Sequence, residues 1–152
     1  MAIRHSKQKT ITICSSTSFY KDVLEIEREL NKFGLKVKVP ANARKMQKSG
    51  NYNEASYRTW YKNPEHYKKK TALINGHFKK ISEADAILVI NKTKRGIRGY
   101  IGGNALMEMT LAYIQKKPIF LWNDISSKSP IEEEVRGLNP IIVGQDITKI
   151  RF

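Results

Sequence analysis

Glu108 is the residue whose type and surroundings most suggest chemistry, because it is an acid in a largely apolar segment over 105–112. A carboxylate among apolar neighbours is costly to bury unless it has a partner or a task. Its place one turn into a predicted helix would let the helix dipole keep it ionised. Such a carboxylate suits attack on, or electrostatic stabilisation of, a cation at a sugar C1′. The alternative is an exposed Glu that only complements the dipole.

Two small-residue loops are candidates for binding an anion. They contain Ser15, Ser16, Thr17 and Ser18 in the first case and Gly102, Gly103 and Asn104 in the second. Backbone N–H groups at helix N-termini can receive a phosphate, and the first loop adds hydroxyl groups. Neither loop is a Walker or G-x-G-x-x-G motif. The alternative is that the glycines only turn the chain and the serines only cap a helix.

The elements that must position these residues follow from the hydrophobic periodicity. Alternating or continuous apolar runs predict strands over 10–14, 35–39, 86–90 and 118–122, with further short strands over 140–143 and 147–150. Helical spacing predicts helices over 19–33, 54–61, 64–81, 104–114 and 130–138, with Asn104 as an N-cap. This order predicts a three-layer α-β-α, Rossmann- or flavodoxin-like open sheet of about five mostly parallel strands, in one domain over 1–152.

A parallel sheet of this kind binds its ligand beyond the carboxyl ends of the strands. The segments expected there are Cys14 to Ser18, Asn91 to Glu108, and the loop with Asn123, which can also reach a neighbouring subunit. Asp85 is expected to orient the start of a strand. Cys14, at a strand end with no His or Lys next to it in sequence, is expected to be buried and inert.

Composition limits the function classes without choosing among them. The chain has 28 Lys and Arg against 14 Asp and Glu, for a formal charge of +14, and a basic, aromatic-bearing insertion occupies about 41–70. This charge attracts mononucleotides, nucleic acid or membrane surfaces alike. One cysteine and three scattered histidines give no zinc spacing. The basic start over 1–9 leads into a run too short for a signal peptide, and no run could span a bilayer, so a cytoplasmic protein is expected.

The order of several short motifs resembles the nucleoside 2-deoxyribosyltransferase superfamily, and within it the 2′-deoxynucleoside 5′-phosphate N-hydrolases. The match covers roughly 11–122 without the insertion. Its motifs are strand–Cys14-Ser15-Ser16–helix–strand, His77-x7-Asp85-Ala-Ile-Leu-Val, a Gly-bearing loop, Glu108-x3-Ala112 and Lys117-Pro118-Ile119.

This resemblance implies that Glu108 is the nucleophile at C1′ of a nucleoside or nucleoside monophosphate, with no metal or organic cofactor, in a homo-oligomer. It places Ser16 and Ser18 on one 5′-phosphate loop, and Gly102, Gly103 and Asn104 near the other. His77 stands where the family has an Asp, so it would protonate the base or hold its edge. Gly102 replaces an Asp or Ser, which leaves the sugar 5′ contact to the backbone or to Asn104.

Other functions remain open at this point. The Gly102-Gly103…Glu108 spacing is also similar, less closely, to the loop of lysine-decarboxylase-like phosphoribohydrolases. The fold would equally suit a non-catalytic nucleotide sensor. Nucleic-acid binding through the insertion is less favoured, because no helix-turn-helix, RNA-recognition or zinc pattern is present. Tyr57, Trp60 and Tyr61 of the insertion are expected either to stack on a nucleobase or to pack in the usual way.

Overall fold

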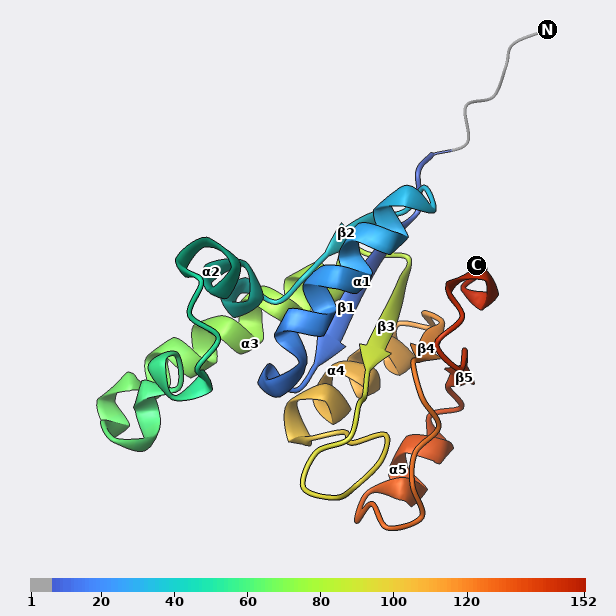
Figure 1. Cartoon of the computed structure of the whole chain (residues 1–152). Coiled ribbons are helices and arrows are strands. Elements are labelled where there is room, and N and C mark those ends of the chain that lie inside the picture. The colour runs from blue at the N-terminus through green and yellow to red at the C-terminus, as the bar shows by residue number, and fades with distance from the viewer. Residues whose placement is uncertain (1–6) are drawn as a thin grey trace, which may run out of the picture.

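The computed structural model describes residues 7–152, in which five parallel strands form one sheet of order β2-β1-β3-β4-β5 (Figure 1). The strands are β1 (Thr10–Ser15), β2 (Lys36–Lys38), β3 (Ala86–Ile90), β4 (Ile119–Leu121) and β5 (Ile141–Ile142). The central pair β1 and β3 is in register at Ile13 and Leu88. This arrangement confirms the predicted α/β open sheet. Of the basic start over 1–9, residues 1–6 lie outside the described residues.

Helices cover both faces of the sheet because the side chains of the central strands alternate between two cores. On one face, Ile11, Leu88 and Phe120 pack with α1 (Tyr20–Lys32) and the C-terminal segment. On the other, residues such as Val89 and Leu121 pack with α3 (Tyr67–Ser82), α4 (Gly103–Ile114) and α5 (Glu132–Gly137). The sheet is therefore the middle layer of three. No helix among residues 7–152 combines the length and apolar character needed to cross a bilayer.

Two predicted elements and one predicted helix cap were wrong, and α2 (Ala41–Ser49) was not predicted at all. Only two apolar side chains of α2, Ala43 and Met46, are buried, which is too few to give a periodic signal. The helix expected over 54–61 is two separate 3₁₀ turns, and 147–150 forms a 3₁₀ turn instead of a strand. Asn104 does not cap α4, since the N-cap is Gly102 and the helix already begins at Gly103.

The insertion is held beside the sheet by contacts with the elements around it. α2 packs against α1, where Arg44 binds Glu27 through both guanidinium nitrogens. In Figure 1, α2 and the turns that follow it project beyond the β2 edge.

At the other end of the sheet, Asp85 accepts a hydrogen bond from the backbone N–H of Thr10 at 2.8 Å, which confirms its predicted role at the start of a strand.

Candidate active site

A cavity of about 390 Å³ opens at the carboxyl ends of β1 and β3. Its walls come from the loop after β1, the insertion, α3, the loop before α4 and the first turns of α4. Its volume falls within the range of ordinary small-molecule sites, about 300–1,000 Å³. The position is the one that ligands take in open parallel sheets.

Glu108 lies at the floor of this cavity and is only 9% exposed. The imidazole of His77, from α3, faces it with Nε2 at 3.3 Å from Oε2 of Glu108. Beneath them lies Cys14 of β1, whose Sγ is 3.6 Å from the same Nε2. Within residues 7–152, Oε2 of Glu108 and Nδ1 of His77 are buried without a hydrogen-bond partner. The fold thus assembles an acid, an imidazole and a thiol from three separate elements.

The charge states of this cluster differ from the sequence-based predictions. Burial raises the pKa of Glu108 to about 7, against smaller opposing effects of the Cys14 thiol and the Lys70 ammonium. The helix dipole was predicted to keep this carboxylate ionised, but burial opposes ionisation, and only part of the protein carries an ionised Glu108 at neutral pH. Burial, followed by the charge of Lys80, lowers the pKa of His77 to about 4. His77 is neutral at pH 7, so it does not have the near-neutral pKa expected for it and forms no ion pair with Glu108.

Cys14 is fully buried, as predicted, and burial together with the nearby Glu108 raises its pKa well above the usual value. Its closeness to His77 was missed, because the two residues are 63 positions apart in sequence and meet only when α3 packs on the sheet.

Four cations surround the mouth of the cavity: Arg58 and Lys70 from the insertion and α3, and Lys94 and Arg95 from the loop after β3. Three of them lie over aromatic rings, with Arg58 over Tyr61, Lys70 over Trp60 and Lys94 over Tyr100 at 4.7–5.4 Å from the ring centroids. We call these four residues the cationic rim.

Few carboxylates lie close enough to the cationic rim to neutralise its positive charge. Among the described residues only Arg58 has a carboxylate within 4 Å, that of Glu54 at 3.4 Å. Burial and then Arg58 lower the pKa of Lys70, against an opposing effect of Glu108, and burial chiefly lowers that of Lys94, against an opposing effect of Glu54. A bound anion would stabilise the charged form of both lysines and so raise both pKa values. The helical and loop positions of these residues gave no sequence signal beyond the general excess of Lys and Arg.

The structure brings most of the predicted binding residues to the cavity. Ser15, Ser16, Gly102, Gly103 and Asn104 line it. The Ser16 hydroxyl accepts a hydrogen bond from Lys94 Nζ at 3.0 Å, which joins the first loop to the cationic rim. Trp60 and Tyr61 also line the cavity. Tyr57 does not, because its hydroxyl group bonds to the carbonyl of Asn51 and to Ser49.

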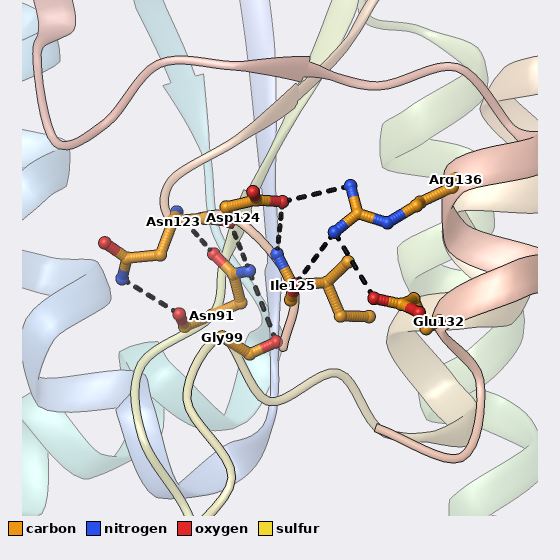
Figure 2. Close-up of polar contacts among 7 residues, drawn as sticks. All are labelled: Asn91, Gly99, Asn123, Asp124, Ile125, Glu132 and Arg136. Atoms are coloured by element: carbon orange, nitrogen blue, oxygen red, sulfur yellow. Dashed lines mark hydrogen bonds and ion pairs between the residues drawn. The ribbon is translucent and has the colours of Figure 1, made fainter. Parts of the chain in front are cut away.

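Two predicted binding residues lie elsewhere. Ser18 is exposed and donates a hydrogen bond to Glu54. Asn123 is outside the cavity lining and belongs to a polar network that joins the loops after β3 and β4 (Figure 2). There its backbone N–H and side chain bond to Asn91 at 2.8 and 3.0 Å, and its carbonyl accepts from the Asn91 amide at 2.7 Å. Asn123 therefore shapes the loops instead of facing a ligand.

The two loops approach too closely for a side chain at Gly99. This residue has φ +65°, and a Cβ there would lie 2.1 Å from the carbonyl oxygen of Asp124. We call this close approach of Gly99 to Asp124 the loop crossing. Next to it, Arg136 of α5 donates hydrogen bonds to the Asp124 carboxylate and to the Ile125 carbonyl (Figure 2). This crossing fixes the base of the loop that carries Lys94.

Comparison with known proteins adds no assignment to this geometry. No model of a protein family matches the chain, and no curated protein matches it in sequence.

Proposed function

We propose that the protein cleaves or transfers the N-glycosidic bond of a (deoxy)nucleoside or its 5′-monophosphate, with Glu108 as the nucleophile at C1′. The observation that carries the proposal is a nine-tenths-buried carboxyl group at the floor of a cavity whose mouth is cationic. Its Oε2 is buried beside His77 Nε2 and has no hydrogen-bond partner within residues 7–152, so this buried oxygen is not satisfied by the protein. The resemblance to nucleoside 2-deoxyribosyltransferases implies the same role for this residue.

In the proposed reaction, ionised Glu108 forms a bond to C1′ while the C1′–N bond breaks and its electron pair leaves with the base. The base takes up one proton. Water, or a second base, then attacks C1′ and releases Glu108 as a carboxylate. Which acceptor arrives decides between hydrolysis and transfer.

His77 suits a hydrogen bond to the base better than proton donation. With a pKa of about 4 it carries no extra proton at neutral pH, although its neutral ring still offers one N–H and one acceptor nitrogen. Water reaching the cavity is the simpler proton source for the departing base.

The cationic rim supports a phosphorylated substrate over a free nucleoside. Lys94 donates a hydrogen bond to Ser16 and so places a positive charge beside the loop after β1, whose hydroxyl groups the sequence indicates as an anion site. A phosphate placed there would gain charge-assisted hydrogen bonds from Lys94 and its neighbours.

A non-catalytic nucleotide sensor is the second candidate, and one observation favours it. The pKa of Glu108 lies near 7, so a large fraction of the free protein holds this group as an uncharged acid at neutral pH. Such a group binds a ligand by hydrogen bonding without attacking it.

The two functions separate in one experiment. Deoxy- and ribonucleosides and their 5′-monophosphates are incubated with the wild type, Glu108→Gln and Glu133→Gln, and released base is followed by chromatography. Glu133 is an exposed Glu of α5 outside the cavity and supplies the same chemical change as a control. Base release by the wild type and Glu133→Gln, but not by Glu108→Gln, supports the enzyme. A nucleotide that raises the melting temperature with no base released by any protein supports the sensor.

A further inference from the structure

The cluster on the cavity floor also has the donor set and spacing of a metal site. Cys14, His77 and Glu108 offer one thiol sulfur, one imidazole nitrogen and one carboxylate oxygen, all within 4.8 Å of one another and all buried. The sequence spacing predicts no such site, because the three residues come from β1, α3 and α4. We propose that these three side chains bind Zn²⁺, and that the bound metal inhibits the protein by occupying Glu108. The inhibition, but not the binding, rests on the proposed function.

Two of the three distances between donor atoms fit tetrahedral zinc, and the third, from Cys14 Sγ to the Glu108 carboxylate, is within 4.8 Å. With Zn–S of about 2.3 Å and Zn–N and Zn–O of about 2.0–2.1 Å, tetrahedral angles separate sulfur from nitrogen by about 3.6 Å and nitrogen from oxygen by about 3.3 Å. The structure has 3.6 Å between Cys14 Sγ and His77 Nε2, and 3.3 Å between that nitrogen and Glu108 Oε2. Two edges of the coordination tetrahedron are therefore already in place.

The charges also balance. Zinc binds thiolate, neutral imidazole and carboxylate, so Zn²⁺ with these three ligands makes a neutral group. Starting from a thiol and a carboxylic acid, one Zn²⁺ enters and two protons leave to solvent, and the net charge of the buried cluster does not change. The metal would also give a partner to Glu108 Oε2, which has none among the described side chains.

The donor set gives selectivity and leaves room for a further ligand. A thiolate and an imidazole favour Zn²⁺ over Mg²⁺ or Ca²⁺, which prefer oxygen ligands. His77 and Glu108 both line the cavity, so the fourth coordination position is expected to face it and to take water or a small anion.

The test measures metal binding independently of activity. Wild-type protein, freed of metal with a chelator, is titrated with Zn²⁺ by calorimetry and with Co²⁺ by absorption spectroscopy. We expect one ion per chain and, for Co²⁺, the intense visible bands of tetrahedral coordination with a thiolate-to-metal charge-transfer band. Because Cys14 is the chain's only cysteine, that band reports on this residue in unmodified protein.

Variants locate the ion. Cys14→Ser is expected to lose the charge-transfer band and at least about tenfold in Zn²⁺ affinity, a loss that Glu108→Gln should match in affinity. His66→Asn is the control, since His66 lies in the insertion and bonds to Thr59 and Asn63. Circular dichroism checks that each variant is folded.

The outcomes separate this proposal from the proposed function. The site is overturned by wild type that binds no Zn²⁺ at micromolar concentration, by Co²⁺ bound without a charge-transfer band, or by equal Mg²⁺ affinity. Zinc bound with no base release under any condition would support the site and count against the enzyme. Base release that continues at full rate in the zinc-saturated protein would overturn the inhibition.

Discussion

Two polar clusters lie at the same edge of the sheet and are built in opposite ways. In the loop crossing of Figure 2, the buried Asn91 amide and the neighbouring Asn123 amide have partners at both ends. On the cavity floor, buried atoms of His77 and Glu108 have none within the part of the chain described. A satisfied network makes a fold rigid, whereas an unsatisfied buried polar group costs stability. The contrast separates a cluster that joins two loops from one whose buried polar atoms lack hydrogen-bond partners.

The largest effect is expected from removing the carboxylate of the cluster on the cavity floor. Glu108→Gln keeps the shape of the side chain but offers no nucleophile, so we expect base release to fall by about a thousandfold or more. Single-turnover assays with the best substrate of the panel measure this loss. A variant that retains more than a tenth of the rate would rule out a nucleophilic role for Glu108.

The loop crossing is expected to tolerate an added side chain less well than the cavity floor does. Gly99→Ala sets a methyl group against the Asp124 carbonyl, so we expect about 3 kcal/mol or more of destabilisation. Gly96→Ala is the matched control, with φ +73° and no atom within 4 Å of the added Cβ, and should cost only about 1 kcal/mol of backbone strain. Urea unfolding compares them, and equal losses would show that the close approach carries no energy.

The floor cluster, in contrast, should gain stability when its charge is removed. The folded-state pKa of Glu108 is raised from 4.5 to about 7, so the wild type loses stability as pH rises through that range. Glu108→Gln has no such loss, and we expect it to be more stable by about 1–3 kcal/mol at pH 8–9, with a smaller difference at pH 5.

The groups that face Glu108 in this comparison are Cys14, Tyr20, Lys70 and His77. Thermal unfolding of both proteins in a chelating buffer, across pH 5 to 9, measures the difference. A gap that stays constant with pH would contradict the assigned direction of the pKa shift.

The smallest effect concerns the cationic rim. Lys94→Ala removes the cation bound to Ser16, so KM for a 5′-monophosphate should rise by about tenfold while KM for the free nucleoside changes little. Lys128→Ala, at an exposed position outside the cavity, is the control. An equal rise for both substrates would mean that Lys94 shapes the loop and does not bind phosphate.

The sequence was sufficient for the sheet but not for the electrostatics of the site. Apolar runs such as 86–90 are long and regular, so the order of strands and helices follows from local patterns. For Glu108 the sequence left both a buried and an exposed position open, and the structure shows it buried. Its pKa did not follow from the sequence, since desolvation depends on how α3 and β1 close over it.

Contacts between distant segments account for the other differences. Asn123 follows a strand end as a ligand-binding residue would, yet it pairs with Asn91 of a neighbouring loop. The cationic rim joins Arg58 and Lys70 to a loop more than twenty residues further along the chain. No spacing rule covers such groupings, because the packing of segments distant in sequence creates them.

The buried position of Cys14 also makes its thiol a probe of local opening of the structure. The chain's single sulfhydryl is sealed at 0% exposure under the cavity floor. A thiol reagent can modify it only during transient opening of the helices above it, so the labelling rate measures how often that opening occurs. Any compound that holds the floor closed should slow the labelling, which gives a ligand screen that requires no knowledge of the substrate.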